Sequence, residues 1–321
     1  AMLACIFVVR YVRRWGFLIK VVMLGAAALL ALPLAIGTEQ NGATNWINIG
    51  GTSVQPSELV KLALLLILSW YMSRRRFLPW FAFAVFSLLV LMLQQDLGTA
   101  LIYYATTLFL FYASTGNLPL TGLGLVGAGG AAVLGYAMFA HVKRRVAIWR
   151  NPWIYYETSG YQIVQMLMAI ASGGLFGVGL GLGAPRVIPV YFTDCIFAVI
   201  CEQFGVIFGA LVLAMYVILI LRGVSIASAA RSSFHALLAM GATVMLGIQT
   251  FIIIGGVLKL IPLTGVTMPF VSYGGTSLVS CMGLIGLIQG VASVNQDDLA
   301  YDYEISHTLQ EEAMMPEADR E

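Results

Sequence analysis

The sequence predicts an all-α fold, that of a polytopic helical integral membrane protein. Hydrophobic residues make up 60% of the 321 residues and charged residues only 10%, whereas soluble globular domains carry about 25% charged residues. Apolar stretches of about 20 residues recur along the chain, and each is long enough to cross a hydrocarbon core about 30 Å thick. A membrane β-barrel would instead show short segments of alternating polarity, so the expected spanning elements are helices.

The chain opens with a short apolar segment that precedes the expected spans. Residues 1–9 are too short to cross a bilayer, and we expect them to be the remnant of a truncated helix at an incomplete N-terminus. The segment lacks the charged region and cleavage site of a signal peptide. Eight complete transmembrane helices are then expected at about 17–36, 59–73, 77–94, 97–113, 118–140, 196–221, 235–258 and 274–293.

Basic side chains in the short connections predict the orientation of these spans. They gather after the second and sixth spans, at Arg74, Arg75, Arg76, Arg222 and Arg231. Counting the crossings puts both connections on one face, which the positive-inside rule identifies as cytoplasmic. The long connection 141–195 is then extracytoplasmic.

We expect a single transmembrane domain over residues 1–294, followed by a tail. Nine of the fifteen acidic residues lie after Ser293, so 295–321 is expected to be a disordered acidic cytoplasmic extension. The 141–195 connection is longer than most loops of compact domains. Its apolar and glycine content argues against disorder, which favours an ordered functional loop.

Two polar segments at the predicted helix starts have structural interpretations. In QPSELVK, Glu58 and Lys61 lie three residues apart on one helical face and enter an apolar run. This spacing favours a structural ion pair over a catalytic one. Asp96, in QQDLGTA, occupies a tight turn between two spans, where helix capping is the simplest interpretation.

The segment VIPVYFTDCIFAVICEQFG, residues 187–205, carries two carboxylates into an apolar run. A charged carboxylate near the bilayer centre costs about 2.5–3.5 kcal/mol on insertion scales. Asp194, at the outer end of the expected span, is interpreted either as a helix cap or as a functional carboxylate. Glu202 is expected two turns deeper, paired or protonated inside the bundle in a supporting role.

Basic and hydroxyl side chains of the outer loops suggest that this face binds an anion. Arg144 and Arg145 directly follow a span, Arg186 lies late in the long loop, and Lys259 and Ser272 lie in the last outer loop. Guanidinium groups bind phosphate bidentately, and the turn around Ser272 offers backbone amides to an anion. The alternative is that the bases anchor lipid headgroups.

Six segments, in order, resemble the signature segments of the SEDS family of shape, elongation, division and sporulation proteins, which includes RodA, FtsW and SpoVE. They are NGATNWINIGGTSVQPSELVKLAL, QQDLGTA, RRVAIWRNPW, GYQIVQMLMAIASGGLFGVGLGLG, IPVYFTDCIFAVICEQFG and TGVTMPFVSYGGTS. The resemblance covers residues 17–293. It implies a ten-span enzyme of the bacterial cytoplasmic membrane that polymerises peptidoglycan glycan strands from lipid II beside a class B penicillin-binding protein. The first span and most of the second would then be absent from this chain.

The resemblance also implies roles for particular residues. Asp194 matches the essential carboxylate of the family's TDFIFA segment, although Cys195 replaces the usual phenylalanine. Glu58 and Lys61 match a Glu–Lys pair of the family, and Asp96 matches the aspartate of its DLGT segment.

The chemistry implied by the resemblance needs few groups. Because undecaprenyl pyrophosphate is already a good leaving group, one base is enough, and we expect Asp194 to deprotonate the acceptor hydroxyl on the extracytoplasmic face. Arg144, Arg145, Arg186 and Lys259 would neutralise the pyrophosphate, with a possible divalent cation, Mg²⁺ or Mn²⁺, and no organic cofactor.

Expected partners are lipid II, the lipid-linked glycan, membrane lipids and the transpeptidase, and no nucleic acid. Two alternatives remain: a noncatalytic scaffold for the transpeptidase, in which Asp194 would be dispensable, and a lipid II flippase, which would need a polar path across the membrane.

Overall fold

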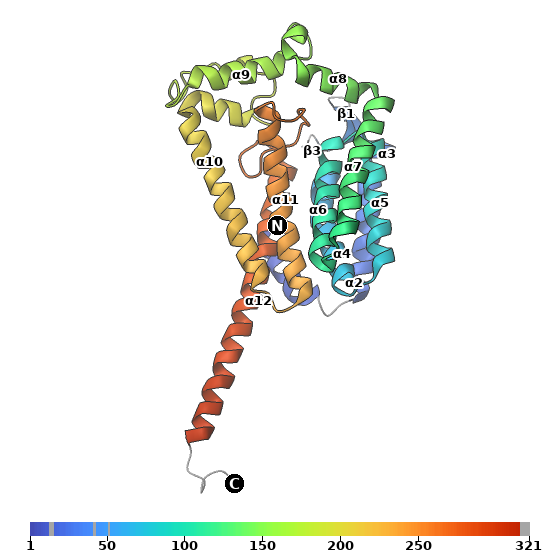
Figure 1. Cartoon of the computed structure of the whole chain (residues 1–321), viewed down its shortest axis with the longest axis vertical. Helices are drawn as coiled ribbons and strands as arrows, with labels where there is room; N and C mark the ends of the chain where they lie inside the picture. Colours follow the sequence, from blue (N-terminus) through green and yellow to red (C-terminus); the bar gives the residue numbers. More distant parts are fainter. Residues whose placement is uncertain (13–15, 41–42, 51, 315–321) are drawn as a thin grey trace.

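The computed structural model describes residues 1–12, 16–40, 43–50 and 52–314, and its helices form two adjacent groups (Figure 1). The helices are α1 (Met2–Val12), α2 (Gly16–Ala31), α3 (Pro33–Ile36), α4 (Pro56–Ser73), α5 (Phe77–Leu93), α6 (Leu97–Thr115), α7 (Leu118–Met138), α8 (Ala140–Arg150), α9 (Tyr161–Gly173), α10 (Ile196–Ser228), α11 (Ser233–Val257) and α12 (Gly275–Met314). Two short 3-10 turns, η1 (Pro152–Tyr155) and η2 (Pro185–Val187), lie in the long loop.

Within these described ranges, seven helical segments are long and apolar enough to cross a membrane. They are Gly16–Ile36, Pro56–Ser73, Leu97–Thr115, Leu118–Met138, Ile196–Ser228, Ser233–Val257 and Gly275–Asp302. The remaining expected span, α5, is apolar but has 17 residues, at the short end of the spanning range. The chain is therefore a polytopic helical membrane protein, and seven of the eight expected spans correspond to helices of sufficient length and hydropathy.

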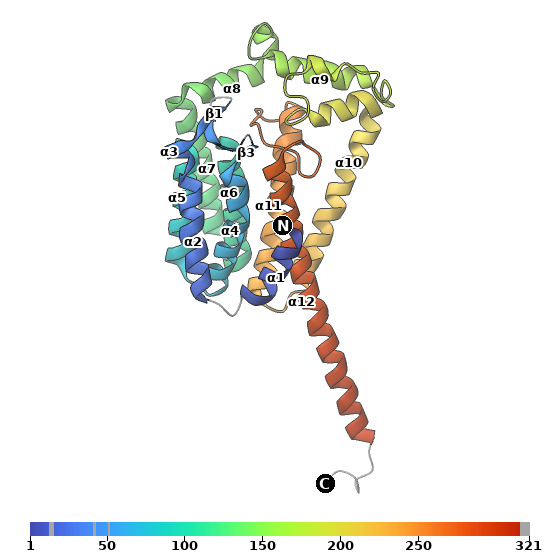
Figure 2. The ribbon, with the colours of Figure 1, turned by 180° about the vertical axis from the view of Figure 1, so that it is seen from behind.

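The two groups of helices pack around α4 and α11. Helices α2, α4, α5, α6 and α7 lie on one side, α10, α11 and α12 on the other, and α1 runs beside α12 (Figures 1 and 2). Completely buried leucines of α4, such as Leu64 and Leu68, share one core with Leu238 of α11 and Leu284 of α12. Gly241 of α11 brings the backbone close to α4, since a Cβ there would meet a Leu65 methyl at 2.8 Å. The core therefore holds both groups together.

The long loop is ordered, as its composition predicted. Helices α8 and α9 run across one end of both groups, nearly perpendicular to the spans (Figure 1). A second core, which includes Ile148 of α8, Met166 of α9 and Phe197 of α10, attaches this layer to α11.

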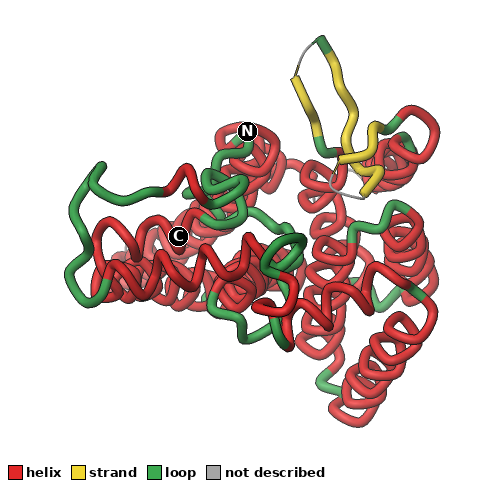
Figure 3. Tube along the Cα trace, turned by 90° about the horizontal axis from the view of Figure 1, so that it is seen from above, coloured by secondary structure: helices red, strands yellow, loops and turns green. Residues whose placement is uncertain are grey.

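A small antiparallel sheet precedes α4, which the sequence analysis missed. Its strands β1 (Thr38–Gln40), β2 (Ala43–Ile49) and β3 (Thr52–Val54) pair in the order β1-β2-β3 and lie at the edge of the molecule in Figure 3. The signal was present, because NG and GG dipeptides flank an alternating segment. The Thr44 amide donates to the Gln94 carbonyl at 3.1 Å, which attaches the sheet to the α5–α6 turn.

Part of the expected disordered tail is helical. Helix α12 continues to Met314 and extends beyond the other helices (Figure 1), so the prediction of disorder differs from the structure over 295–314. Residues 315–321 lie outside the described residues. Half-exposed ion pairs join Asp297 to Arg10 and Asp302 to Arg231, and the Glu, Ala, Leu and Gln content of the segment favours helix.

A break at Gly205 divides α10. Its φ of 84° and ψ of 166° are not helical, and Figure 1 shows the part before the break lying beside α9 while the longer part runs along the bundle. The expectation of one straight span, with Glu202 two turns deeper than Asp194, is therefore wrong. The apolar run gave no sign of the break because both parts are hydrophobic.

The glycine-rich loop after α9 supplies the hydrogen bonds that the break removes. The amides of Val178 and Gly179 donate to the carbonyls of Glu202 and Gln203 at 2.9 and 3.0 Å. On the other side of the break, the amide of Val206 donates to the Gly174 carbonyl at 2.9 Å, and the next amide donates to the next carbonyl at 3.3 Å. Backbone groups in this position need partners, because neither lipid nor a packed interior offers water.

We predict that Gly205→Ala destabilises the protein by about 1–3 kcal/mol or more, because only glycine readily adopts this backbone conformation. A Cβ at this position would also lie 2.1 Å from the Leu175 carbonyl oxygen. The measurement is the melting temperature of the purified protein in detergent. Gly25→Ala in α2 is the control, since a Cβ there meets nothing within 4 Å. Equal melting temperatures for the two variants would contradict the assignment.

Candidate active site

Asp194 lies between the long loop and the last outer loop, residues 259–274, which connects α11 to α12. The Ser272 hydroxyl donates to the Thr193 carbonyl at 2.7 Å, and the Tyr273 amide donates to the Phe192 carbonyl at 2.8 Å. A Cβ on Gly265 would lie 3.6 Å from Asp194 Oδ2, so this glycine leaves the carboxylate open on that side. The two loops together therefore fix the backbone that carries the carboxylate.

The carboxylate of Asp194 does not cap α10. The residue preceding the helix is Cys195, and no side chain makes a capping hydrogen bond there. The neighbouring Thr193 does not cap the helix either, because its hydroxyl donates to the Val190 carbonyl at 3.2 Å. The helix-cap interpretation of Asp194 is therefore wrong, and its charge is not used to start the helix.

The environment of Asp194 favours a carboxylate that gains and loses a proton near neutral pH. Burial raises the pKa of Asp194 to about 6, against smaller opposing effects of the Thr193 hydroxyl and the Arg145 charge. Burial also lowers the pKa of Arg145. The charges of Asp96 and Asp194 oppose this effect, because each of them raises the pKa of Arg145. Arg145, half-buried on α8, thus lies within electrostatic range of both carboxylates.

The other predicted basic residues have partners or exposure of their own. Arg144 is exposed, and its Nε is 3.4 Å from the Ser159 hydroxyl. Arg186 is exposed on η2. Lys259 is half-buried, and its carbonyl accepts a hydrogen bond from Trp149 Nε1 at 3.0 Å, which joins α8 to the last outer loop. Of these bases, Arg145 is the one whose charge lowers the pKa of Asp194.

Ser272 has a different arrangement from the one expected. Its hydroxyl accepts from the Met268 amide at 2.8 Å and donates to the Thr193 carbonyl. These two hydrogen bonds join the two loops and leave one acceptor position of the hydroxyl open, so substrate binding by Ser272 stays a prediction.

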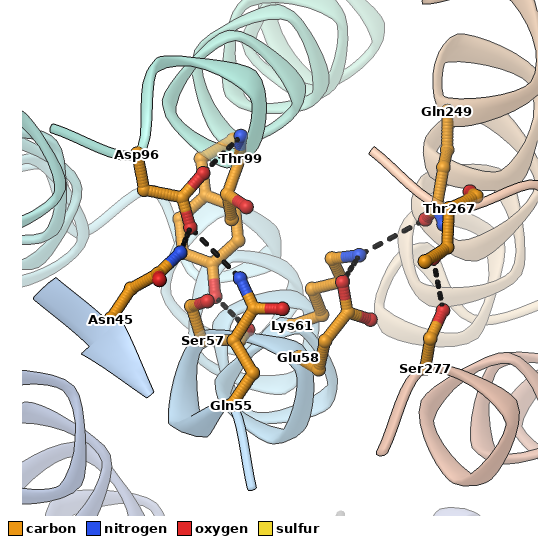
Figure 4. Close-up of polar contacts among 11 residues, drawn as sticks. Asn45, Gln55, Ser57, Glu58, Lys61, Asp96, Thr99, Gln249, Thr267 and Ser277 are labelled. Carbon is orange, nitrogen blue, oxygen red and sulfur yellow. Dashed lines mark hydrogen bonds and ion pairs between the residues drawn. The ribbon is translucent and has the colours of Figure 1, made fainter. Parts of the chain in front are cut away.

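The expected ion pair is present and continues into the last outer loop (Figure 4). Lys61 Nζ is 2.7 Å from Glu58 Oε1 and donates to Gln249 Oε1 at 3.0 Å. Gln249 Nε2 in turn donates to the Thr267 carbonyl at 2.9 Å, and the Thr267 hydroxyl is 2.6 Å from that of Ser277. A buried chain of polar contacts therefore links α4 and α11 to the loop that lies against Asp194.

Gln249 was missed in the sequence analysis. A glutamine in the middle of the apolar span 235–258 is itself a signal, because a buried amide without partners is costly. Its partners, however, come from segments far apart in the chain, and no local pattern identifies them.

Asp96 caps α6 as expected and also joins two other segments to this helix (Figure 4). Its Oδ1 accepts from the Thr99 amide at 3.1 Å. Its Oδ2 accepts from Asn45 Nδ2 of the sheet at 2.8 Å and from Gln55 Nε2 before α4 at 2.9 Å. Because this carboxylate accepts three hydrogen bonds from the protein, its role is to hold these segments together.

Glu202 contacts the end of the glycine-rich loop. Its Oε1 accepts from the Ala184 amide at 3.1 Å, and a Cβ on Gly183 would lie 2.7 Å from its Cδ. The side chain is 7% exposed. It therefore orders the loop that leads to Arg186, at the surface layer and not deep in the bundle.

Two further features of the described part of the chain concern metal ligands and thiols. No group of three or more His, Cys, Asp or Glu side chains is arranged there to hold a metal ion. Cys195 is completely buried against Gln162 Nε2, at 3.1 Å, and burial raises its thiol pKa to about 12. Cys195 therefore packs as a small buried hydrophobic residue.

Comparisons with known proteins agree with the sequence segments described above. Residues 1–297 match the model of the FtsW, RodA and SpoVE family, described as cell cycle protein. The chain is 38% identical over 303 residues to the peptidoglycan glycosyltransferase RodA of Mycobacterium leprae, covering 88% of this chain and 64% of that protein. It is 35% identical over 292 residues to the stage V sporulation protein E of Bacillus subtilis, covering 87% and 79%.

The fold is also similar to a solved structure described as "Structural coordination of polymerization and crosslinking by a peptidoglycan synthase complex". The TM-score is 0.77 at 27% identity, with coverage of 92% of this chain and 87% of the other. The chain spans 64% of the length of the RodA relative, less than two thirds. The family match extends over most of this chain, and the chain therefore belongs to the FtsW, RodA and SpoVE family of cell cycle proteins.

Proposed function

We propose that this protein polymerises peptidoglycan glycan strands, with Asp194 as the general base. The observation that carries the proposal is a half-buried carboxylate, unused by the helix it precedes, beside a half-buried arginine. The names of the RodA relative and of the synthase complex support the reaction class.

In the proposed reaction, the ionised Asp194 accepts the proton of the GlcNAc 4-hydroxyl of lipid II. The oxygen then attacks the anomeric carbon of the growing strand, whose bond to undecaprenyl pyrophosphate breaks with both electrons leaving on the phosphate oxygen. The attack inverts the anomeric carbon and forms a β-1,4 link. A carboxylate with pKa about 6 is ionised at neutral pH and still basic enough to take the proton.

Arg145 would neutralise the leaving pyrophosphate. The charge of Asp194 acts on Arg145 and raises its pKa. The exposed Arg144 directly precedes Arg145 in the same helix. Preorganised cations of this kind stabilise charge that develops in the transition state. Arg186 and Lys259 would act further along the lipid-linked substrate.

A divalent cation could be held at this site together with the substrate. Mg²⁺ is commonly held by one or two carboxylates together with substrate phosphates. Asp194 is the carboxylate that could serve here, and the pyrophosphate would supply the other oxygens. No organic cofactor is needed.

The proposed location of the reaction is the extracytoplasmic face of the bacterial cytoplasmic membrane. The positive-inside rule supports this orientation, since Arg74, Arg75 and Arg76 lie at the end of the bundle away from α8 and α9. A class B penicillin-binding protein is the proposed partner, because the similar solved structure couples polymerisation to crosslinking.

We predict that Asp194→Asn lowers the rate of lipid II polymerisation by about 10²–10⁴-fold, the usual contribution of a general base. The assay uses the full-length protein with its transpeptidase, and moenomycin silences polymerases of the other class. Glu157→Gln, at an exposed carboxylate of the same loop, should leave the rate unchanged. Strand synthesis by a folded Asp194→Asn variant at the wild-type rate would instead favour another base, and no synthesis by the wild type would favour a scaffold or a flippase.

The rate should fall as the pH drops below about 6, because Asp194 must be ionised to act as a base. Arg145 lowers the pKa of Asp194. In Arg145→Gln the acidic limb of the pH–rate profile should therefore move to higher pH, and KM should rise if the guanidinium binds substrate. Profiles that superimpose after scaling would contradict the electrostatic link between the two residues.

We predict that Gln249→Met lowers kcat by about 10–100-fold with little change in KM, because small misplacements of reacting groups are costly. The substitution keeps the side-chain volume but removes both hydrogen bonds of Gln249. Thr250→Val is the matched control: the Thr250 hydroxyl is buried on the same helix but donates only within it, to the Leu246 carbonyl at 2.8 Å. Equal kcat values for both variants, at equal melting temperatures, would remove Gln249 from its positioning role.

A further inference from the structure

A second site lies at the end of the bundle away from Asp194. A cavity of about 450 Å³ opens between the start of α2 and the end of α4. Its lining consists of one glycine, three aromatic residues and three basic residues: Gly16, Phe17, Trp70, Tyr71, Lys20, Arg74 and Arg76. Neither the ion pair of α4 nor the proposed reaction uses these side chains.

The cavity concentrates positive charge. Its lining contains three cations and no carboxylate. The guanidinium of Arg74 lies 3.4 Å from the centre of the Trp70 ring, and this cation–π contact helps to hold its position. In the part of the chain that the structure describes, no carboxylate forms an ion pair with Lys20 or Arg76. An anion would reduce the repulsion among these groups.

The floor of the cavity is rigid. Trp70 and Tyr71 are 6% and 5% exposed, and Trp70 packs edge-on against Phe234 with ring centroids 5.9 Å apart. A Cβ on Gly16 would lie 3.4 Å from the Trp70 ring, so a glycine at the start of α2 keeps the cavity open there. The site is therefore formed before any ligand arrives.

An apolar stripe leads out of the cavity along α2. Phe17, Val21 and Leu24 are 79%, 48% and 69% exposed, and their spacing of four and three residues puts them on one helical face. Lys20 directly precedes Val21 and lies three residues after Phe17 in the sequence. A ligand that combines a phosphate with an acyl chain would satisfy the cavity and the stripe together, whereas a free phosphate would use only the first.

We propose that this cavity binds the phosphate of an anionic phospholipid headgroup, with an acyl chain lying along α2. The Arg76 guanidinium and the Lys20 ammonium, both in the lining, match the oxygens of a phosphodiester, and basic pockets between transmembrane helices on the cytoplasmic side bind anionic headgroups. The assignment to the cytoplasmic leaflet rests on the orientation proposed above, but the site is independent of the proposed reaction.

Arg75 provides the control that separates a site from diffuse attraction. It lies in the same turn, between Arg74 and Arg76, but lines a separate cavity of about 220 Å³ with residues such as Trp80 and Phe111. Replacing Arg75 lowers the positive charge of this face by one unit and leaves the lining of the larger cavity intact.

The test is native mass spectrometry of the full chain purified in neutral detergent, titrated with phosphatidylglycerol and, separately, with phosphatidylcholine of the same acyl chains. We expect the wild type to retain one phosphatidylglycerol in preference to phosphatidylcholine. The double variant Lys20→Gln/Arg76→Gln should bind it about 30-fold more weakly, at roughly fivefold per base. Arg75→Gln should change the affinity by less than about twofold.

Conservative variants and a soluble competitor complete the test. Lys20→Arg/Arg76→Lys should retain the bound lipid, which separates lost charge from lost folding, and melting temperatures check the fold directly. Comparable losses per charge in Arg75→Gln and in the double variant would overturn the site in favour of diffuse attraction. If glycerol phosphate displaced the lipid at equal concentration, a free phosphate would be the ligand and the lipid assignment would be overturned.

Discussion

The buried charge of Lys61 constrains the arrangement of the whole molecule. Its side chain has no exposed surface, so the ammonium must have acceptors within the bundle, because an unpaired charge there costs several kcal/mol. Glu58 supplies one acceptor from the same helix and Gln249 supplies another from α11. Since the amide oxygen of Gln249 must face the ammonium, its NH₂ group faces the last outer loop and donates to Thr267. The orientation of the Gln249 amide is thus set by the Lys61 ammonium at its oxygen and by the Thr267 carbonyl at its nitrogen.

The second constraint is the hydrogen bonding of the backbone where helices stop inside apolar surroundings. Helix α10 changes direction at Gly205, and the glycine-rich loop provides partners on both sides of the break. This arrangement puts Asp194 and Glu202 in the surface layer beside α9 rather than along a membrane-spanning axis. In the proposed reaction, this position lets lipid-anchored sugars meet a proton acceptor near the membrane surface. The burial that raises the pKa of Asp194 is retained there.

The sequence was sufficient where one local physical rule decides the outcome. Hydropathy predicted the helical membrane class, helical spacing predicted the Glu58–Lys61 pair, and turn chemistry predicted the cap at Asp96. It was insufficient where the outcome depends on distant segments or on a conformation that hydropathy does not register. The break at Gly205 leaves an apolar run unchanged in composition, and the partners of Gln249 lie 188 and 18 residues away in the chain. Asp194 was identified through family resemblance, while its freedom from capping became visible only in the structure.

The hydrogen bonds around Gly205 also limit how the length of the chain can vary. The loop is pinned by the carbonyls of Gly174 and Leu175 on one side and by the amides of Val178 and Gly179 on the other. Only Phe176 and Gly177 lie between them, and Gly177 has no room for a Cβ beside the Gln203 carbonyl, 2.2 Å away. An insertion or deletion in this stretch would undo two bonds at once. The exposed stretch between Leu180 and Leu182 makes none of these hydrogen bonds across the break. We therefore expect insertions and deletions to be tolerated after Gly179 and not between Gly174 and Gly179.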